Sequence, residues 1–222
     1  MVAGVTDRAT GSLGLSASDP AEQVTGRLRA FRAAMRPEFT ALHMAHQVHG
    51  RDVAWHERVP PGWHVRDDVD GHATEQPGLL LAVTVADCVP VYLTTRDGRA
   101  VALLHAGWRG TAGGVLEAGV RLLCERSKAS PAELVMHCGV GICGSCYEVG
   151  EEVARAVLGA EARPGKQRLD LRAALSRQGE ALGIREITIS PLCPSCHNDR
   201  FFSHRANADG GRQIAYLGRP IP

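Results

Sequence analysis

One apolar stretch constrains the fold of this chain more than any other. It reads LLLAVTVADCVPVYL from Leu79 to Leu93, continues to Thr94, and contains a single charged residue, Asp87. A helix needs about 18 apolar residues in succession to cross a bilayer, and Asp87 interrupts this run. Short runs rich in Leu and Val are typical of buried strands. We therefore predict buried β-structure here, with Pro90 either dividing the run into two strands or placing it at a sheet edge.

The rest of the chain alternates between strand-like and helix-like segments. Further strands are predicted at residues 44–48, 53–56, 100–104, 134–138 and 184–190. Helices are predicted at residues 21–35, from 111 or 112 to 126, and at 150–158 and 171–182. Asp19, Pro20 and Glu22 are expected to start the first helix, and Asp170 to cap the last. This mixture predicts an α/β or α+β fold. Without an internal repeat or linker, we expect one domain over residues 1–222.

Composition and charge exclude several classes of partner. The 222 residues are 44% hydrophobic and 22% charged, as in ordinary globular proteins. A formal net charge of +1 argues against broad electrostatic binding of nucleic acid or membrane, and 5% aromatic content argues against a base-stacking platform. The first residues carry early charges and no apolar signal core, so a cytoplasmic protein is expected. Nothing in the sequence identifies a protein partner.

Three short segments place possible metal ligands beside predicted strand ends. They contain His49 in QVHG, Cys88 in ADCVP and His105 in LHAGWRG. Two imidazoles and one thiolate suit zinc, and three protein ligands leave the fourth tetrahedral position open, as in catalytic sites. Water in that position becomes a nucleophile near neutral pH. The three residues are therefore candidate catalytic as well as metal-binding groups.

Other interpretations of these residues stay open. His49 alone could be a loop histidine, and Cys88 a small buried hydrophobe. Cys88 could also act as a nucleophile with His105 as its base, which would compete with metal binding. Asp87 is either a carboxylate that orients a ligand or a surface residue. Either Asp87 or a neighbouring histidine is a candidate general acid/base.

The glycine-rich segment from Gly107 to Gly114 is predicted to enter a helix. Backbone N–H groups there, together with Arg109, are suited to phosphate. The segment lacks the Gly-Lys-Ser/Thr ending of a Walker A loop, which argues against nucleoside triphosphate hydrolysis. Close packing of a helix on a strand would explain the same glycines. Near the C-terminus, Phe201 and Phe202 could wall a pocket while Arg205 meets an anion, or they could fill the core from an amphipathic strand.

Two Cys-x-x-Cys motifs, Cys143–Cys146 and Cys193–Cys196, hold four of the seven cysteines. The gap between them, residues 147–192, exceeds the roughly 15–20 residues of a usual zinc ribbon. A compact ribbon is therefore not expected, although a site joining two parts of one domain stays open. His137, Cys138 and His197 are further candidate ligands nearby. We expect accessory or free thiols in preference to an all-cysteine zinc site, and a thioredoxin-type redox motif less still.

Taken together, these motifs resemble a known family. QVHG, TVADCVPVYL, LHAGWRG, GICGSCYEVG and FFSHR occur in the order found in the laccase-domain family, now described as purine nucleoside phosphorylases with adenosine deaminase activity. The resemblance covers nearly the whole chain and includes the N-terminal VTDR segment. It implies one domain of stacked mixed β-sheets flanked by helices, in the α/β/β/α arrangement of a group of cysteine-and-histidine hydrolases. The Cys193–Cys196 motif departs from the family's more usual Cys-Thr.

The resemblance also assigns roles to residues. It places the metal on His49, Cys88 and His105, and it implies that Arg8, Gln47, Arg109 and Arg205 contact phosphate or substrate. It implies zinc as cofactor and purine nucleosides and phosphate as substrates. Two alternatives are a copper-dependent polyphenol oxidase and a non-catalytic, zinc-stabilised partner-binding protein. A true multicopper oxidase needs more paired histidines than the ten scattered here.

Overall fold

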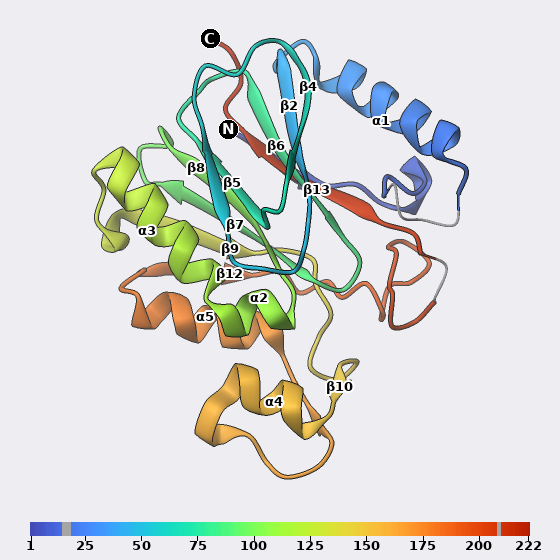
Figure 1. Ribbon diagram of the computed structural model, residues 1–222, viewed down its shortest axis with the longest axis vertical. Helices are drawn as coiled ribbons and strands as arrows, with labels where there is room; N and C mark the ends of the chain where they lie inside the picture. Colours follow the sequence, from blue (N-terminus) through green and yellow to red (C-terminus); the bar gives the residue numbers. More distant parts are fainter. Residues whose placement is uncertain (15–18, 208–209) are drawn as a thin grey trace.

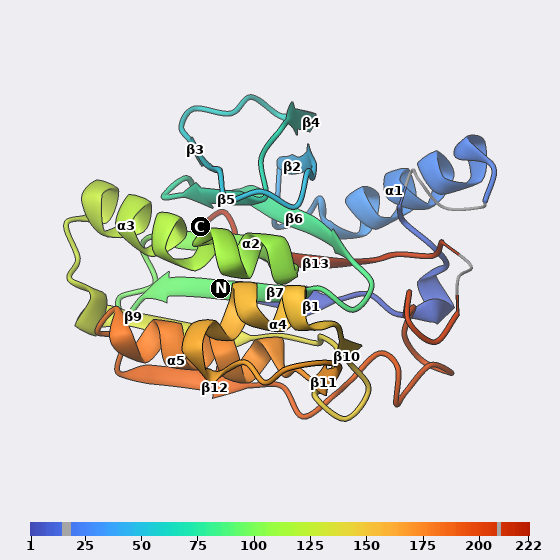
Figure 2. The same cartoon turned by 60° about the horizontal axis from the view of Figure 1, so that its bottom comes forward.

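The computed structural model describes residues 1–14, 19–207 and 210–222, and its architecture is two stacked β-sheets with helices on both outer faces (Figures 1 and 2). The first sheet has the strand order β1-β13-β6-β2-β4. Its members are β1 (Val2–Val5), β2 (Ala41–His46), β4 (Gly62–Asp67), β6 (Leu79–Val85) and β13 (Gln213–Gly218). β2 runs parallel to β4 and β6, whereas β13 runs antiparallel to β1 and β6, so the sheet is mixed.

The second sheet has the order β12-β9-β7-β8-β5-β3 and is also mixed. Its members are β3 (Val53–His56), β5 (Gly71–Thr74), β7 (Val89–Thr95), β8 (Val101–Ala106), β9 (Leu134–Cys138) and β12 (Glu186–Ile189). A small ribbon pairs β10 (Glu148–Val149) with β11 (Gln167–Arg168). The fold class expected from the family resemblance, stacked mixed sheets flanked by helices, is confirmed.

Helices cover the outer face of each sheet. On the first sheet α1 (Ala21–Met35) buries Val24 and Leu28 against the strands. On the second sheet lie α2 (Trp108–Gly113), α3 (Val115–Ser127) and α5 (Leu171–Ala181), on the side of the molecule away from α1, and α4 (Glu151–Leu158) packs against α2 and α5 (Figure 1). Short 3₁₀ turns occur at Arg8–Thr10, Pro131–Glu133 and Gly159–Glu161 within the described residues.

Strand β8 shows why the sequence stacks in these layers. All six of its residues are buried, because one side of the strand faces the other sheet and the opposite side faces the helices. Val101 and Leu103 contribute to the core between the sheets, whereas Ala102 and Leu104 contribute to the core beneath the helices. The continuous apolar pattern is what a strand buried on both faces requires.

Several expected boundaries are confirmed and some are wrong. The strands at residues 53–56 and 134–138 and the helix at residues 21–35 lie where predicted. Asp19 does not cap α1, because Pro20 occupies that position and the Asp19 carboxylate pairs with Arg27 instead. Asp170 does cap α5, accepting hydrogen bonds from the N–H groups of Arg172 and Ala173.

The long apolar run does divide in two, but Pro90 is not the cause. The chain turns at Asp87, whose φ of 81° is in the left-handed region. Pro90 is the second residue of β7, opposite His105, and the ladder between β7 and β9 begins only at Val91. No ladder bond therefore needs the missing N–H, which lets proline occupy a strand flanked on both sides.

The helix expected from residue 111 or 112 to residue 126 is two helices. Gly114, with φ 86°, ends α2 and precedes α3. Trp108–Gly113, the glycine-rich segment, is thus helical itself and forms a short helix directly after β8. A further difference concerns Phe201 and Phe202, which are buried, as the core-filling alternative required, but lie in a loop and not in a strand.

Candidate metal centre

His49, Cys88 and His105 meet at the seam between the two sheets. Their potential ligand atoms all lie within 4.8 Å of one another. His49 follows β2 of the first sheet and His105 lies near the end of β8 of the second. Cys88 stands on the connection that passes from β6 in one sheet to β7 in the other. Three residues far apart in sequence are thus brought together because three strands end at one edge.

A buried carboxylate that the sequence analysis did not single out, Asp70, orients two of the three ligands. One oxygen, Oδ1, accepts from the His49 N–H at 3.0 Å and from His105 Nδ1 at 2.8 Å. The other, Oδ2, accepts from the N–H groups of Val48 at 3.2 Å and Gly50 at 2.6 Å. His105 Nε2 is therefore the ring nitrogen turned toward the site, as in carboxylate–histidine–metal arrangements.

Asp70 also explains the backbone conformation of the His49 loop. His49 has φ 59°, in the left-handed region that L-residues seldom occupy. That conformation lets three successive N–H groups converge on one carboxylate. Burial would raise the pKa of Asp70, but the hydrogen bonds from His105, Gly50 and Val48 and the charge on His105 lower it. A sequence signal existed, since Asp70 directly precedes the buried strand β5, but nothing in its spacing pointed to His105.

Cys88 and His105 form a charge pair. Burial would raise the pKa of the Cys88 thiol, but the His105 charge and hydrogen bonds from His105 and His49 lower it to about 6. Burial would lower the pKa of His105, but the Cys88 thiolate and Asp70 raise it. The geometry therefore favours the thiolate, which is both the metal-binding and the nucleophilic form of cysteine.

The surroundings of the three ligands fit a metal ion with one open position. A Cβ on Gly107 would lie 3.0 Å from Cys88 Sγ and 3.2 Å from His49 Cδ2, so the absence of a side chain there leaves room beside the ligands. His105 is buried, Cys88 is partly buried and His49 is exposed. The group is thus accessible from one side, which is typical of catalytic sites and not of closed structural ones.

Asp87 does not orient a metal ligand. Its carboxylate accepts hydrogen bonds from Ser203 Oγ at 2.7 Å and from the Arg205 N–H at 2.6 Å, and its carbonyl accepts the Ile142 N–H at 2.9 Å. Asp87 therefore fixes two loops beside Cys88, and the orienting role belongs to Asp70. The suggestion that Asp87 orients a ligand is wrong.

Tyr147 is a second site residue that the sequence analysis missed. Burial and the negative charges of Cys88 and Asp87 raise the pKa of its phenol, while Arg205 and Arg109 act in the opposite direction. The Arg205 guanidinium lies over the Tyr147 ring, 5.1 Å from its centroid, and that of Arg109 lies 4.3 Å from the centroid of the Trp108 ring. The Tyr147 phenol is thus near enough to Cys88 and to two exposed arginines for their charges to affect its pKa.

The two other residues predicted to contact phosphate or substrate have structural partners. The Gln47 amide hydrogen-bonds the backbone N–H, the carbonyl and the hydroxyl of Thr84, which ties the end of β2 to β6. Arg8 donates to the Phe201 carbonyl and to Asn198 Oδ1, each at 3.0 Å, and its guanidinium lies over the Phe202 ring. Arg8 therefore connects the N-terminal segment to the Phe201–Phe202 loop.

Two further clusters of possible ligands occur in the described part of the chain. His43, His56 and His72 are buried together, with His56 Nε2 2.9 Å from His72 Nδ1. Burial lowers the pKa of all three, so they are neutral near pH 7. The four cysteines of the Cys-x-x-Cys motifs form the other cluster. His137 and Cys138 lie apart from it, since they contact Thr188 and Arg172 respectively.

One mostly apolar cavity of the protein lies away from this centre. A cavity of about 320 Å³ opens between β1, β7 and β9, lined by residues such as Val5, Tyr92 and Val140. None of the three candidate ligands lines it. The candidate site is therefore identified by the types of its side chains and not by the shape of a cavity.

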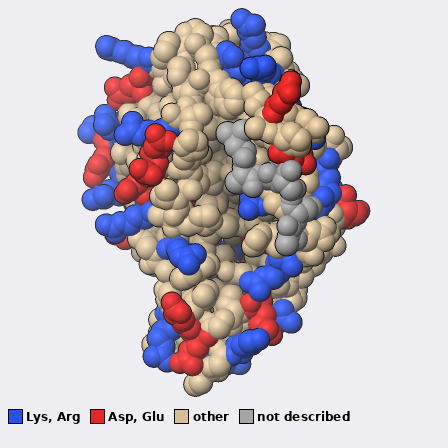
Figure 3. All heavy atoms as spheres, turned by 45° about the vertical axis from the view of Figure 1, so that its right-hand side comes forward, with Lys and Arg blue, Asp and Glu red and all other residues tan. Residues whose placement is uncertain are grey.

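The surface agrees with the small net charge. Basic and acidic side chains are interspersed over the face shown in Figure 3, with no extended patch of one sign on that face. Among the described residues, no helix is long and apolar enough to span a membrane.

Comparisons with known proteins identify the family of the chain. The model of a family described as multi-copper polyphenol oxidoreductase laccase matches residues 3–220. The purine nucleoside phosphorylase YlmD of Geobacillus stearothermophilus is 35% identical over an alignment of 192 residues, and the match covers 78% of this chain and 70% of that protein. A purine nucleoside phosphorylase of Streptomyces coelicolor is 38% identical over an alignment of 182 residues, and the match covers 77% of this chain and 72% of that protein.

A protein named adenosine deaminase RL5, from an unknown prokaryotic organism, is 35% identical over an alignment of 166 residues, and the match covers 69% of this chain and 63% of that protein. The crystal structure of YlmD from Geobacillus stearothermophilus superposes with a TM-score of 0.90 at 31% identity, covering 99% of this chain and 92% of that one. Because sequence and fold both match over nearly its full length, the chain belongs to the multi-copper polyphenol oxidoreductase laccase family, whose curated relatives include purine nucleoside phosphorylases.

Proposed function

We propose that this chain is a zinc-dependent purine nucleoside phosphorylase that also deaminates adenosine. The phosphorolytic reaction converts inosine, guanosine or adenosine and phosphate into the free base and ribose 1-phosphate. The observation that carries the proposal is the accessible group of His49, Cys88 and His105, with Tyr147 nearby and two arginines close to Tyr147, in a chain whose relatives are named for these two activities.

The donor set supports zinc as the metal. Two imidazoles and one thiolate, with Asp70 orienting His105, are ligands that zinc takes in catalytic sites. A zinc ion held there supplies Lewis-acid activation of water for attack on the purine C6, the step that deamination requires.

The chain's own groups bind and orient the substrates. Arg109 and Arg205 are exposed beside Tyr147, and we assign the phosphate to them, because guanidinium groups match phosphate oxygens bidentately. Tyr147 keeps its proton at neutral pH and donates a hydrogen bond to the nucleoside. Holding phosphate and ribose in one orientation is the main contribution a protein makes to such a transfer. Arg8 and Gln47 act indirectly, because they position the segments that they join.

Incubation of metal-loaded protein with inosine and phosphate tests the proposal. We expect hypoxanthine and ribose 1-phosphate in equal amounts, and inosine with ammonia when adenosine is supplied without phosphate. Cys88→Ala should abolish turnover while leaving the circular dichroism spectrum unchanged. Cys124→Ala, a cysteine of α3 outside both thiol-containing clusters, is the matched control and should keep full activity. If neither nucleoside is converted, the proposal fails.

The same assay separates the alternatives. A copper polyphenol oxidase would consume oxygen with a phenol and would carry copper after purification. A cysteine nucleophile would keep its activity after chelation and lose it on alkylation of Cys88, because the thiolate would then act without a metal. Loss of activity on chelation, with recovery on adding zinc, supports the proposal over both.

A further inference from the structure

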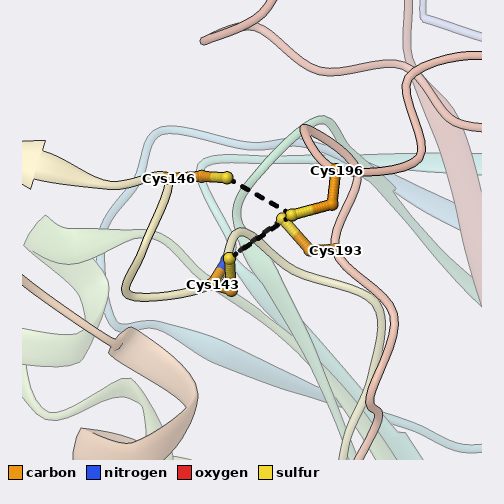
Figure 4. A group of neighbouring side chains, drawn as sticks. All are labelled: Cys143, Cys146, Cys193 and Cys196. Carbon is orange, nitrogen blue, oxygen red and sulfur yellow. Dashed lines mark hydrogen bonds between the residues drawn. The ribbon is translucent and has the colours of Figure 1, made fainter.

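We propose that Cys143, Cys146, Cys193 and Cys196 form a second, structural metal site that binds zinc through four thiolates. The two Cys-x-x-Cys motifs are separated by residues 147–192, yet the fold brings them face to face (Figure 4). All four sulfur atoms lie within 4.8 Å of one another. The long gap excluded a compact ribbon, but it does not prevent a site that joins two loops of one fold.

The sulfur–sulfur distances match tetrahedral coordination. A metal with four bonds to sulfur of about 2.3 Å holds its sulfurs about 3.8 Å apart. Cys143 Sγ and Cys196 Sγ are 3.8 Å apart, and Cys146 Sγ and Cys196 Sγ are 3.4 Å apart. A disulfide requires about 2.05 Å, so the arrangement fits a common central ion better than a covalent pair. Figure 4 shows the four side chains pointing toward one another from two separate loops.

Backbone N–H groups are directed at the sulfurs in the same way in both motifs. The Cys193 sulfur, which is buried, accepts the Cys143 N–H at 3.3 Å and also faces the N–H groups of Ser195 and Cys196. The Cys143 sulfur faces the Cys146 N–H. N–H donors favour the charged form of a sulfur, and they are the second set of contacts that holds thiolate ligands in place.

The ligand set also selects the metal. Four thiolates in a tetrahedron suit zinc or iron, and a site closed by four protein ligands is structural. It therefore differs in kind from the accessible group at His49, Cys88 and His105, which keeps one position open. No residue is shared between the two.

The position of this thiol site gives it a role in shaping the other one. The first motif follows Ile142, whose N–H binds the Asp87 carbonyl. The second motif leads into the loop whose Ser203 hydroxyl and Arg205 N–H bind the Asp87 carboxylate. A metal joining the motifs would clamp together the two loops that hold Asp87, the neighbour of Cys88.

Metal analysis of purified, zinc-reconstituted protein tests this site without an activity assay. We expect two zinc ions per chain in the unmodified protein and one in Cys88→Ala. X-ray absorption at the zinc edge of Cys88→Ala should show a shell of sulfur only, at about 2.3 Å. The double variant Cys146→Ser with Cys196→Ser should lose one zinc and keep the one at Cys88, whereas Cys124→Ser should keep both.

Several results would overturn the inference. One zinc in the unmodified protein and none in Cys88→Ala would show that the four thiols bind no metal. A mass lower by two or four hydrogens, without metal, would show disulfides instead. Iron in place of zinc would refute the choice of metal. If the double variant does not fold, the absorption spectrum of Cys88→Ala still decides, since nitrogen ligands in that shell would contradict a four-sulfur site.

Discussion

Replacing Asp70 by asparagine should weaken metal binding at His49, Cys88 and His105 more than any other change of one carboxylate to an amide. The Asp70 carboxylate is fully buried and accepts four hydrogen bonds, three from backbone N–H groups and one from the His105 ring. Each oxygen accepts two of them. An asparagine presents an NH₂ group in place of one oxygen, so two donors lose their acceptor whichever way the amide turns.

The magnitude follows from those two donors. Leaving one buried donor without a partner costs about 1–3 kcal/mol, so the free energy of unfolding should fall by roughly 2–6 kcal/mol. Loss of an orienting carboxylate typically weakens metal binding by about 10- to 100-fold. Both effects come from one residue because Asp70 holds the His49 loop and the His105 ring together.

Two measurements check this prediction. Denaturant unfolding of the metal-free protein gives the change in stability, and competition with a chromophoric chelator gives the change in zinc affinity. Asp68→Asn is the matched control, because Asp68 lies two residues away, is exposed, and has φ 59°, a conformation that asparagine tolerates. The reasoning is refuted if Asp70→Asn binds zinc as tightly as Asp68→Asn or unfolds at the same denaturant concentration.

Three further predictions concern the surroundings of the site. Gly110→Ala should destabilise the protein by about 1–3 kcal/mol, because the new Cβ would lie 2.8 Å from the Gly50 carbonyl oxygen. Gly113→Ala should leave the stability unchanged, because its Cβ would meet nothing closer than 4.0 Å. Equal melting temperatures of the two variants would contradict close packing at Gly110. Tyr147→Phe should lower kcat about tenfold through loss of one hydrogen bond of roughly 1.5 kcal/mol, and it should leave the affinity for zinc unchanged. A change in zinc affinity without a change in kcat would show instead that the phenol acts on the metal site. Burial lowers the pKa of His56 to about 3 and that of His72 well below 6.5. At pH values below about 6.5 the unfolded chain therefore binds protons that the folded chain does not. The free energy of unfolding should then fall by about 1.4 kcal/mol per pH unit for each residue. Denaturant unfolding measured from pH 7 to pH 5 gives the slope of stability against pH. His72→Leu should reduce this slope, whereas His46→Gln, at an exposed position, should leave it unchanged. A stability that does not change with pH would contradict neutral buried imidazoles.

The layers of the fold were easier to predict from the sequence than the ends of its strands and helices. Strands buried on both faces, such as β8, carry continuous apolar sequence that predicts them directly. The edge strands β1 and β4 bury less and were not predicted, because their patterns are weak. The buried strands β5 and β13 were also not predicted, because their sequences GHAT and QIAYLG mix polar and apolar residues and form no continuous apolar run. Pro90 was misjudged because its effect depends on which neighbour pairs with it, and pairing is a property of the tertiary structure.

At the site, residues recognisable by their chemistry could be predicted, whereas residues that matter through their position in the fold could not. His49, Cys88 and His105 could be selected from the sequence because few residue types bind zinc and their motifs are distinctive. Asp70 and Tyr147 could not, since an aspartate or a tyrosine has many common roles. Their importance depends on contacts across the fold, 35 residues in the case of Asp70 and His105. The four thiols were correctly noticed as two pairs, but the sequence could not show that the pairs face one another.

The position of His49, Cys88 and His105 at the seam of the two sheets has a consequence for the order of assembly. No one sheet carries all three ligands, so a chain in which the sheets have formed but not yet docked has no complete metal site. Capture of a metal by all three residues would therefore be a late event in folding, and a metal present at 1,000 times its dissociation constant would add about 4 kcal/mol to the stability of the folded state alone. That energy would oppose separation of the sheets, so metal uptake measured during refolding would report the moment at which the two layers close.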